Sequence, residues 1–142
     1  MPTDFDLQRF LDAQANVYGA VIVELTAGRK RSHWMWYIFP QIAGLGFSEM
    51  SQRFAISGRD EAAAYLNHTV LGARLRECTQ LVLNVRDREI NEIFGSPDDL
   101  KFRSSMTLFS ASTSENEVFK AALTKYFDGV PDPRTIEFMA AH

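Results

Sequence analysis

The segment TVLGARLRECTQLVLNV, residues 69–85, is the longest amphipathic stretch in the sequence. Its apolar side chains recur at intervals of three and four residues, which places them on one face of an α-helix. They are Leu71, Leu75, Cys78, Leu81, Val82 and Val85. Gly72 interrupts the pattern near its start, and a close crossing with a second helix would account for it. The segment therefore predicts a long helix buried along one face, with Cys78 as an inert thiol.

Signals for further helices flank this segment on both sides. Ser48 can cap a helix, and Ser96-Pro-Asp-Asp99 combines a cap, a proline and two acids in the order that starts one. Ser114-Glu-Asn-Glu117 has the spacing of a capping box, and Gly28 stands where a helix stops. No strand–turn–strand pattern, repeat or linker separates these segments. We therefore predict an all-α fold over residues 1–142, a compact single-domain bundle of about seven to nine short-to-medium helices.

One segment, His33–Phe39, carries the aromatic and branched residues that suit a β-strand. A strand needs a pairing partner, and the sequence offers no second segment of this kind. We therefore expect at most a minor extended segment around His33–Phe39 within an otherwise helical fold.

The composition of the 142 residues limits the classes of function. With 46% hydrophobic residues and a net charge of -3, the chain is typical of a globular protein rather than a dedicated nucleic-acid binder, so no DNA or RNA partner is expected. Its longest apolar stretch, Trp34–Pro40, is too short to cross a bilayer, and the N-terminus lacks the features of a secretory signal. The single cysteine cannot form an intramolecular disulfide. We expect a cytoplasmic protein with no membrane partner.

Positive charge and aromatic residues are densest in Arg29–Gly46, RKRSHWMWYIFPQIAGLG. Lys30 and Arg31 are candidates to bind the phosphate or carboxylate of a ligand, while Trp34 or Trp36 stacks on its ring. The alternative is that the cations complement the end of the preceding helix and the rings enter the core. Two indoles two residues apart cannot share one face of a helix or a strand, so one of them should lie at a surface or a pocket.

A glycine turn closes this segment, with Gly44 and Gly46 just before the predicted cap at Ser48. Backbone N–H groups at such a turn can approach an anion closely. We count Gln41, which precedes the two glycines, among the ligand-binding candidates. The alternative is an ordinary loop in which the glycines only permit the turn.

A second polar group occupies the helix predicted to start near residue 98. Lys101 and Ser104 are ligand-binding candidates there, and Asp99 and Ser105 are catalytic candidates that would orient ligand or water. Lys101 lies one helical turn from Ser105, which is the arrangement of Ser–Lys nucleophilic pairs. The alternative is that the hydroxyls bond back to helix carbonyls where helices pack closely.

His33 is the third catalytic candidate, because histidine side chains titrate near neutral pH and can act as general acids or bases. The other two histidines, His68 and His142, stand in a turn and at the C-terminus. No HxxxH, HxH or Cys–His spacing is present, so we expect no metal site and no cofactor.

Motifs in both polar groups, and in the helices around them, match those of one bacterial family. They are Asp6-Leu7, Arg9-Phe10, Glu24-Leu25, Gly28, Lys30, Ser32–Gln41, Gly44–Gly46, Leu71-Gly72, Arg74-Leu75, Phe94-Gly95, Asp99, Lys101 and Ser104–Phe109. On these positions nearly the whole chain resembles the domain of unknown function number eighteen-ten. The resemblance implies a compact, mainly α-helical domain with no established activity. Some members are labelled calpastatin, but an inhibitor of that kind would be extended, repetitive and poor in aromatic residues, unlike this chain.

Two functions stay open on the sequence alone. In the first, the two polar groups meet in a cleft that binds a small anionic, nucleotide-like ligand, with or without hydrolysing it. This requires Lys30, His33 and Lys101 to converge within the width of one ligand. In the second, the chain is a non-enzymatic regulatory or protein–protein interaction module that uses an exposed aromatic and basic patch. The sequence decides neither whether the protein is an enzyme nor whether it forms a homo-oligomer.

Overall fold

The computed structural model describes residues 5–141, which form ten helices. In chain order these are α1 (Gln8–Gln14), α2 (Tyr18–Thr26), α3 (Met35–Ile38), α4 (Glu49–Arg53), α5 (Arg59–Asn67), α6 (Thr69–Asn84), α7 (Ile90–Phe94), α8 (Asp98–Ser110), α9 (Glu117–Phe127) and α10 (Pro133–Ala141). Extended structure within this range is limited to one isolated parallel bridge between Ile42 and Ile56. The predicted all-α fold is therefore confirmed, although residues 5–141 form ten helices rather than the seven to nine expected. None of the helices described is long and apolar enough to cross a membrane.

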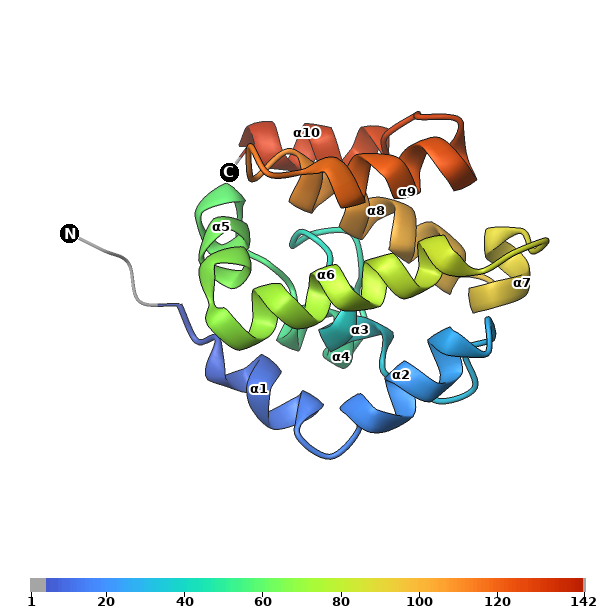
Figure 1. The fold of residues 1–142 in the computed structure, drawn as a ribbon. Coiled ribbons are helices and arrows are strands. Elements are labelled where there is room, and N and C mark those ends of the chain that lie inside the picture. The colour runs from blue at the N-terminus through green and yellow to red at the C-terminus, as the bar shows by residue number, and fades with distance from the viewer. Residues whose placement is uncertain (1–4, 142) are drawn as a thin grey trace.

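Helix α6 lies across the middle of the molecule, with α8, α9 and α10 on one side of it and α1 and α2 on the other (Figure 1). It packs against α2, α5 and α9, and its predicted apolar face is buried except at Leu81, which is half-buried. Burial raises the pKa of the Cys78 thiol to about 12, which agrees with the inert role expected for it. The close crossing expected at Gly72 is also present, because a Cβ at this position would lie 2.0 Å from the carbonyl oxygen of Leu66 in α5.

The predicted helix boundaries near Gly28 and Ser48 are confirmed. Gly28 follows α2 with a φ of 75°, and the Ser48 hydroxyl accepts a hydrogen bond from the amide of Ser51 at 3.1 Å. The helix predicted from Ser96–Asp99 starts one residue later than expected. Helix α8 begins at Asp98, with Pro97 in the cap position and no side-chain hydrogen bond to the cap.

The capping box predicted at Ser114–Glu117 is wrong, because α9 begins only at Glu117. Two side-chain contacts hold the preceding segment as a loop: the side-chain amide of Asn116 donates to the Ser110 carbonyl at 2.9 Å, and Arg76, 39 positions away, donates to the Glu115 carbonyl at 2.8 Å. A capping box forms instead at α7, where glutamates occupy both of its positions, at residues 89 and 92. Contacts outside the local sequence therefore decide where α9 begins.

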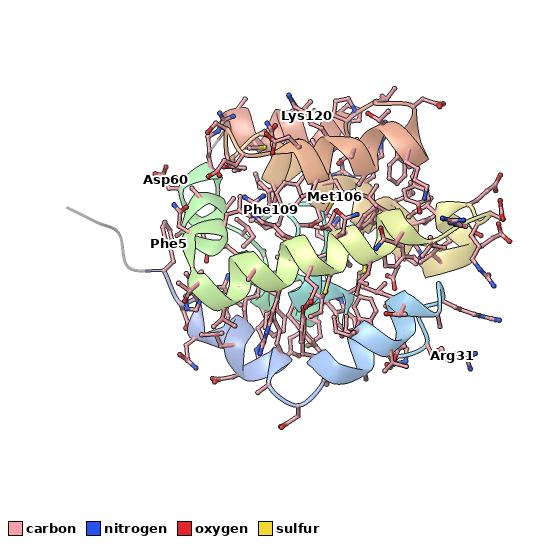
Figure 2. The ribbon with its side chains drawn as sticks, in the orientation of Figure 1. Phe5, Arg31, Asp60, Met106, Phe109 and Lys120 are labelled. Carbon is pink, nitrogen blue, oxygen red and sulfur yellow. The ribbon has the colours of Figure 1, made fainter. Side chains whose placement is uncertain are left out.

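Aromatic rings fill the interior, as expected for a chain with eleven phenylalanines. The ring of Phe102 lies 5.0 Å from Phe39 in an edge-to-face arrangement and 5.0 Å from Phe94 in a stacked one. Met106 and Phe109, on the same helix, lie within the body of the molecule (Figure 2). The His33–Phe39 segment reaches this core through the four-residue helix α3 rather than through a strand.

Candidate functional site

The loop that follows α2 is organised around one buried carboxylate, that of Glu24. It accepts hydrogen bonds from the backbone amides of Arg31 and Ser32 at 2.7 and 2.9 Å and from the indole nitrogen of Trp34 at 3.0 Å. The Ser32 hydroxyl donates a further bond. Burial alone would raise the pKa of Glu24, but these hydrogen bonds outweigh it and lower the pKa to about 2. Glu24 therefore stays ionised and fixes the path of the basic segment.

The two tryptophans have different environments, as their spacing predicts. Trp34 is buried with 1% of its surface exposed, whereas Trp36 is half-buried. A lysine ammonium lies over each ring: that of Lys30 is 5.3 Å from the centroid of Trp34, and that of Lys101 is 5.6 Å from the centroid of Trp36. Both rings thus position cations.

The two lysines converge on the carboxylate of Asp98, at the start of α8. Lys30 binds one carboxylate oxygen at 2.9 Å, and Lys101 approaches the other at 3.7 Å. The two basic positions predicted from separate segments therefore meet at one group. Asp98 itself was expected only to start the helix, because its place in the first turn already explains an acidic residue there.

Lys101 opens onto a hollow of about 350 Å³, which we call the Lys101 pocket. Three predicted ligand-binding residues, Gln41, Lys101 and Ser104, line it together. Its complete lining is Gln41, Leu45, Gly46, Pro97, Leu100, Lys101, Ser104, Asp132 and Arg134. The pocket thus joins the glycine turn, one side of α8 and the start of α10.

The glycine turn is held in place by two neighbours. Ile56 donates its amide to the Gln41 carbonyl and accepts from the amide of Ala43, both at 2.8 Å. Gly44 has a φ of 103°, and a Cβ there would meet the ring of Phe138 in α10 at 3.5 Å. The left-handed backbone conformation therefore requires glycine at this point, where the turn passes against α10.

The opposite wall is fixed by hydrogen bonds between α8 and the first turn of α10. The Asp132 carboxylate accepts from the Ser104 hydroxyl at 3.0 Å and from the amide and hydroxyl of Thr135 at 3.2 and 2.5 Å. The Asp132 amide in turn donates to the Thr107 hydroxyl at 2.9 Å. These bonds stabilise the negative charge of Asp132 and spread it into the N-terminus of α10.

The cations of the Lys101 pocket are less well neutralised than its acid. Arg134 forms no ion pair with any residue in the range 5–141, and its guanidinium lies 5.6 Å from the ring of Phe138. Lys101 is 3.7 Å from Asp98, close to the limit for an ion pair. Both side chains therefore retain donors for an anion.

Lys30 lies on the other side of Asp98 and lines a different hollow, which we call the basic pocket. It measures about 430 Å³ and is bounded by Arg29, Lys30, Arg88, Asn91, Glu92, Ile93, Phe94 and Gly95. The single cleft expected from the sequence is therefore divided into two pockets. Asp98 connects them, because its carboxylate contacts one lysine of each.

The remaining predicted residues of the basic segment line neither pocket. Arg31 points away from the body of the molecule (Figure 2), and His33 is exposed, with its backbone carbonyl accepting from Tyr37 at 3.3 Å. Asp99 binds the side-chain amide of Asn91 at 3.2 Å and so ties α7 to α8. The expected convergence of His33 with the two lysines is not seen among the contacts of the described residues.

The hydroxyls of α8 largely follow the packing alternative. Ser104, Thr107 and Ser110 each donate to a carbonyl three or four residues earlier, at 3.1, 2.8 and 3.1 Å. Ser105 differs, because it is fully buried and its hydroxyl has no hydrogen-bond partner among residues 5–141. It lines neither pocket, so the structure does not bring it to a ligand.

Replacing Ser105 with alanine should therefore raise the free energy of unfolding by about 1 kcal/mol, because a buried hydroxyl without a partner is costly. The neighbouring Ser104→Ala is the matched control and should lower it by about 1 kcal/mol, since Ser104 bonds to Asp132. Urea unfolding of both variants measures the difference. A clear loss of stability in Ser105→Ala would show that its hydroxyl is bonded in the native protein.

Several pocket residues were not found from the sequence. Arg88, Asp132 and Arg134 sit on segments that carried no functional signal of their own. Asp132 and Arg134 flank Pro133, where the helix-start pattern already explains a polar residue. They reach the Lys101 pocket only because α8 binds the beginning of α10.

Comparisons with known proteins agree with this fold. The profile of the family described as "Protein of unknown function (DUF1810)" matches residues 4–139. A crystal structure of the conserved hypothetical protein Rv1873 from Mycobacterium tuberculosis is 57% identical and has a TM-score of 0.95, covering 96% of this chain and 97% of that one. A comparison with curated proteins finds no match.

Proposed function

This chain belongs to the bacterial DUF1810 family, whose description assigns no function, so we infer its role from its own side chains. We propose that it binds a small organic anion in the Lys101 pocket. The observation that carries the proposal is the meeting of Lys101 and Arg134 in one hollow, whose single lining carboxylate, that of Asp132, is already hydrogen-bonded by Ser104 and Thr135. The two cations bind the anionic group. The Gln41 side-chain amide orients it.

The other side of the pocket favours a ligand with an apolar part. Leu45, Pro97 and Leu100 line it, and Leu100 keeps 58% of its surface exposed although it is a large apolar side chain. A volume of about 350 Å³ is near the lower end of the range for small-molecule sites. An aryl or acyl carboxylate or phosphate meets both requirements.

We propose binding without a chemical reaction at this site. The catalytic candidates His33, Asp99 and Ser105 do not line the pocket, and the one carboxylate that does, that of Asp132, is held by hydrogen bonds from Ser104 and Thr135. Hydrolysis of a nucleotide-like ligand stays a prediction from the sequence alone. Neither tryptophan lines the pocket, so the proposal does not depend on ring stacking.

The protein–protein alternative has less support. It requires an exposed tryptophan patch, whereas Trp34 is buried and Trp36 is half-buried beneath Lys101. Hot-spot surfaces depend on such aromatic anchors being accessible to the partner. We therefore propose no second function.

A thermal-shift panel of phenyl phosphate, benzoate, AMP and ADP-ribose tests the proposal. A ligand at 100 times its dissociation constant should stabilise the protein by about 2.7 kcal/mol. Lys101→Gln and Arg134→Gln should each raise the dissociation constant about tenfold, because a charged hydrogen bond is lost. Calorimetric titration measures this effect.

Arg59→Gln is the control, because Arg59 is exposed on α5 and does not line the pocket. It should leave the affinity within about twofold. The proposal fails if no member of the panel binds, or if binding is unchanged in the Lys101 and Arg134 variants.

A further inference from the structure

The basic pocket concentrates positive charge in a chain whose net charge is -3. Three of its lining side chains, those of Arg29, Lys30 and Arg88, are cationic, and one, that of Glu92, is acidic. The hollow lies where the end of α2, the loop before α7 and the end of α7 meet. It shares none of its lining residues with the Lys101 pocket.

The acids around this pocket are already engaged. The Glu92 carboxylate accepts from the Glu89 amide at 2.9 Å as part of the capping box of α7. Lys30, whose side chain is 9% exposed, is paired with Asp98 at 2.9 Å. Arg29 and Arg88 are both exposed, and within residues 5–141 neither forms an ion pair. Two guanidinium groups therefore remain unneutralised at one hollow.

A structural explanation for these arginines is that they complement the negative ends of α2 and α7. In that case their guanidinium groups should donate to the last carbonyls of those helices. The hydrogen bonds of the described residues include none from the side chain of Arg29 or Arg88 to a carbonyl. Hydrogen-bonded helix capping therefore does not account for the pair.

Backbone contacts around the basic pocket fix the positions of Lys30 and Arg88. The Lys30 amide donates to the Ile93 carbonyl at 2.7 Å, which joins the end of α2 to α7. Gly28, with a φ of 75°, leaves room for the Arg88 side chain: a Cβ there would lie 3.4 Å from its Cδ and 3.1 Å from Val85. The stem of Arg88 thus packs across the Gly28 turn beside Arg29.

From these observations we propose that the basic pocket binds a phosphorylated small molecule, at a site separate from the Lys101 pocket. Paired guanidinium groups match the geometry of phosphate oxygens and bind them through two parallel hydrogen bonds. A hollow of about 430 Å³ has room for more than one phosphoryl group. Inorganic pyrophosphate is therefore the simplest probe for the site.

Calorimetric titration of the full chain with pyrophosphate, at 0.05 and 0.15 M salt, tests the proposal. We expect saturable binding to the wild type that weakens as the salt concentration rises. Arg29→Gln and Arg88→Gln should each raise the dissociation constant about tenfold, because each removes one charged donor pair. Both side chains are exposed, so both variants should fold.

Arg59→Gln is the matched control, because it removes an exposed guanidinium that lines neither pocket. It should leave the dissociation constant within about twofold. Arg134→Gln shows whether pyrophosphate binds in the Lys101 pocket instead. Absence of saturable binding to the wild type overturns the inference, as does unchanged binding in Arg29→Gln and Arg88→Gln. A tenfold loss in Arg134→Gln alone would place pyrophosphate in the Lys101 pocket, which also overturns this inference while supporting the proposed function.

Discussion

Replacing Gly72 with alanine is expected to lower the free energy of unfolding by at least about 3 kcal/mol. The added Cβ would lie 2.0 Å from the carbonyl oxygen of Leu66 and 2.9 Å from its carbonyl carbon. Both are backbone atoms of α5, so no side-chain rotation can relieve the overlap. The chain can accommodate the methyl group only by moving the end of α5 away from the start of α6, which disturbs the packing of both helices.

Chemical denaturation of Gly72→Ala against Gly19→Ala measures this effect. Gly19 is also a helical glycine, on α2, but a Cβ there would meet nothing within 4 Å. Alanine at Gly19 should therefore stabilise the protein by up to about 1 kcal/mol through helix propensity. Equal stability of the two variants would mean that α5 and α6 do not cross as closely as described.

Replacing Glu24 with glutamine should lower the free energy of unfolding at pH 7 by about 3 kcal/mol or more, because charged hydrogen bonds are lost and the new amide group faces donors. The carboxylate accepts from two backbone amides, a hydroxyl and an indole. A glutamine carbonyl can serve some of these donors, while its NH₂ group confronts the others. The loop over residues 31–34 should therefore lose its fixed path.

The same residue predicts a dependence of stability on pH. Its pKa is lowered from 4.5 in the unfolded chain to about 2 in the folded protein. The stabilisation is therefore complete above about pH 4.5 and is lost as the pH falls toward 2, amounting to about 3 kcal/mol. Glu24→Gln should remove this part of the acid sensitivity.

Urea unfolding between pH 2 and 7 measures both effects. The control is Glu137→Gln, an exposed position on α10, which should change the stability by less than about 0.5 kcal/mol. If the wild type and Glu24→Gln lose stability equally between pH 4.5 and 2, the carboxylate is not held as described.

Helical periodicity was enough to predict the fold class and the buried face of α6, because that pattern depends only on which side chains leave water. It was not enough to place every helix end. Residues 114–117 have the spacing of a capping box, yet the Asn116 side chain binds the carbonyl of Ser110 at the end of α8, the Arg76 side chain binds that of Glu115, and α9 begins only at Glu117. The Arg76 contact joins residues 39 positions apart, so it leaves no local pattern.

The candidate site was predictable to a similar extent. As basic residues next to aromatic or hydroxyl side chains, Lys30 and Lys101 were both predicted to bind one anionic ligand. The structure brings both to Asp98. Arg88 and Arg134 could not be found, because single exposed arginines are common on any surface and only the packing of helices brings these two to pockets. The sequence pattern of α8 also does not show which of its serines is fully buried. Ser105 was therefore named as a catalytic candidate although it lies in the core.

The carboxylate of Asp98 would couple the binding of the two proposed ligands. It serves as the counter-ion of one lysine from each pocket, and the contact to Lys30 is the shorter one. An anion that draws Lys101 away would leave Asp98 to Lys30 alone, and an anion that draws Lys30 away would do the reverse. By thermodynamic linkage, each ligand then alters the affinity of the other by the same factor. Two small anions would in that way be sensed jointly, through one shared charge and without any change of fold.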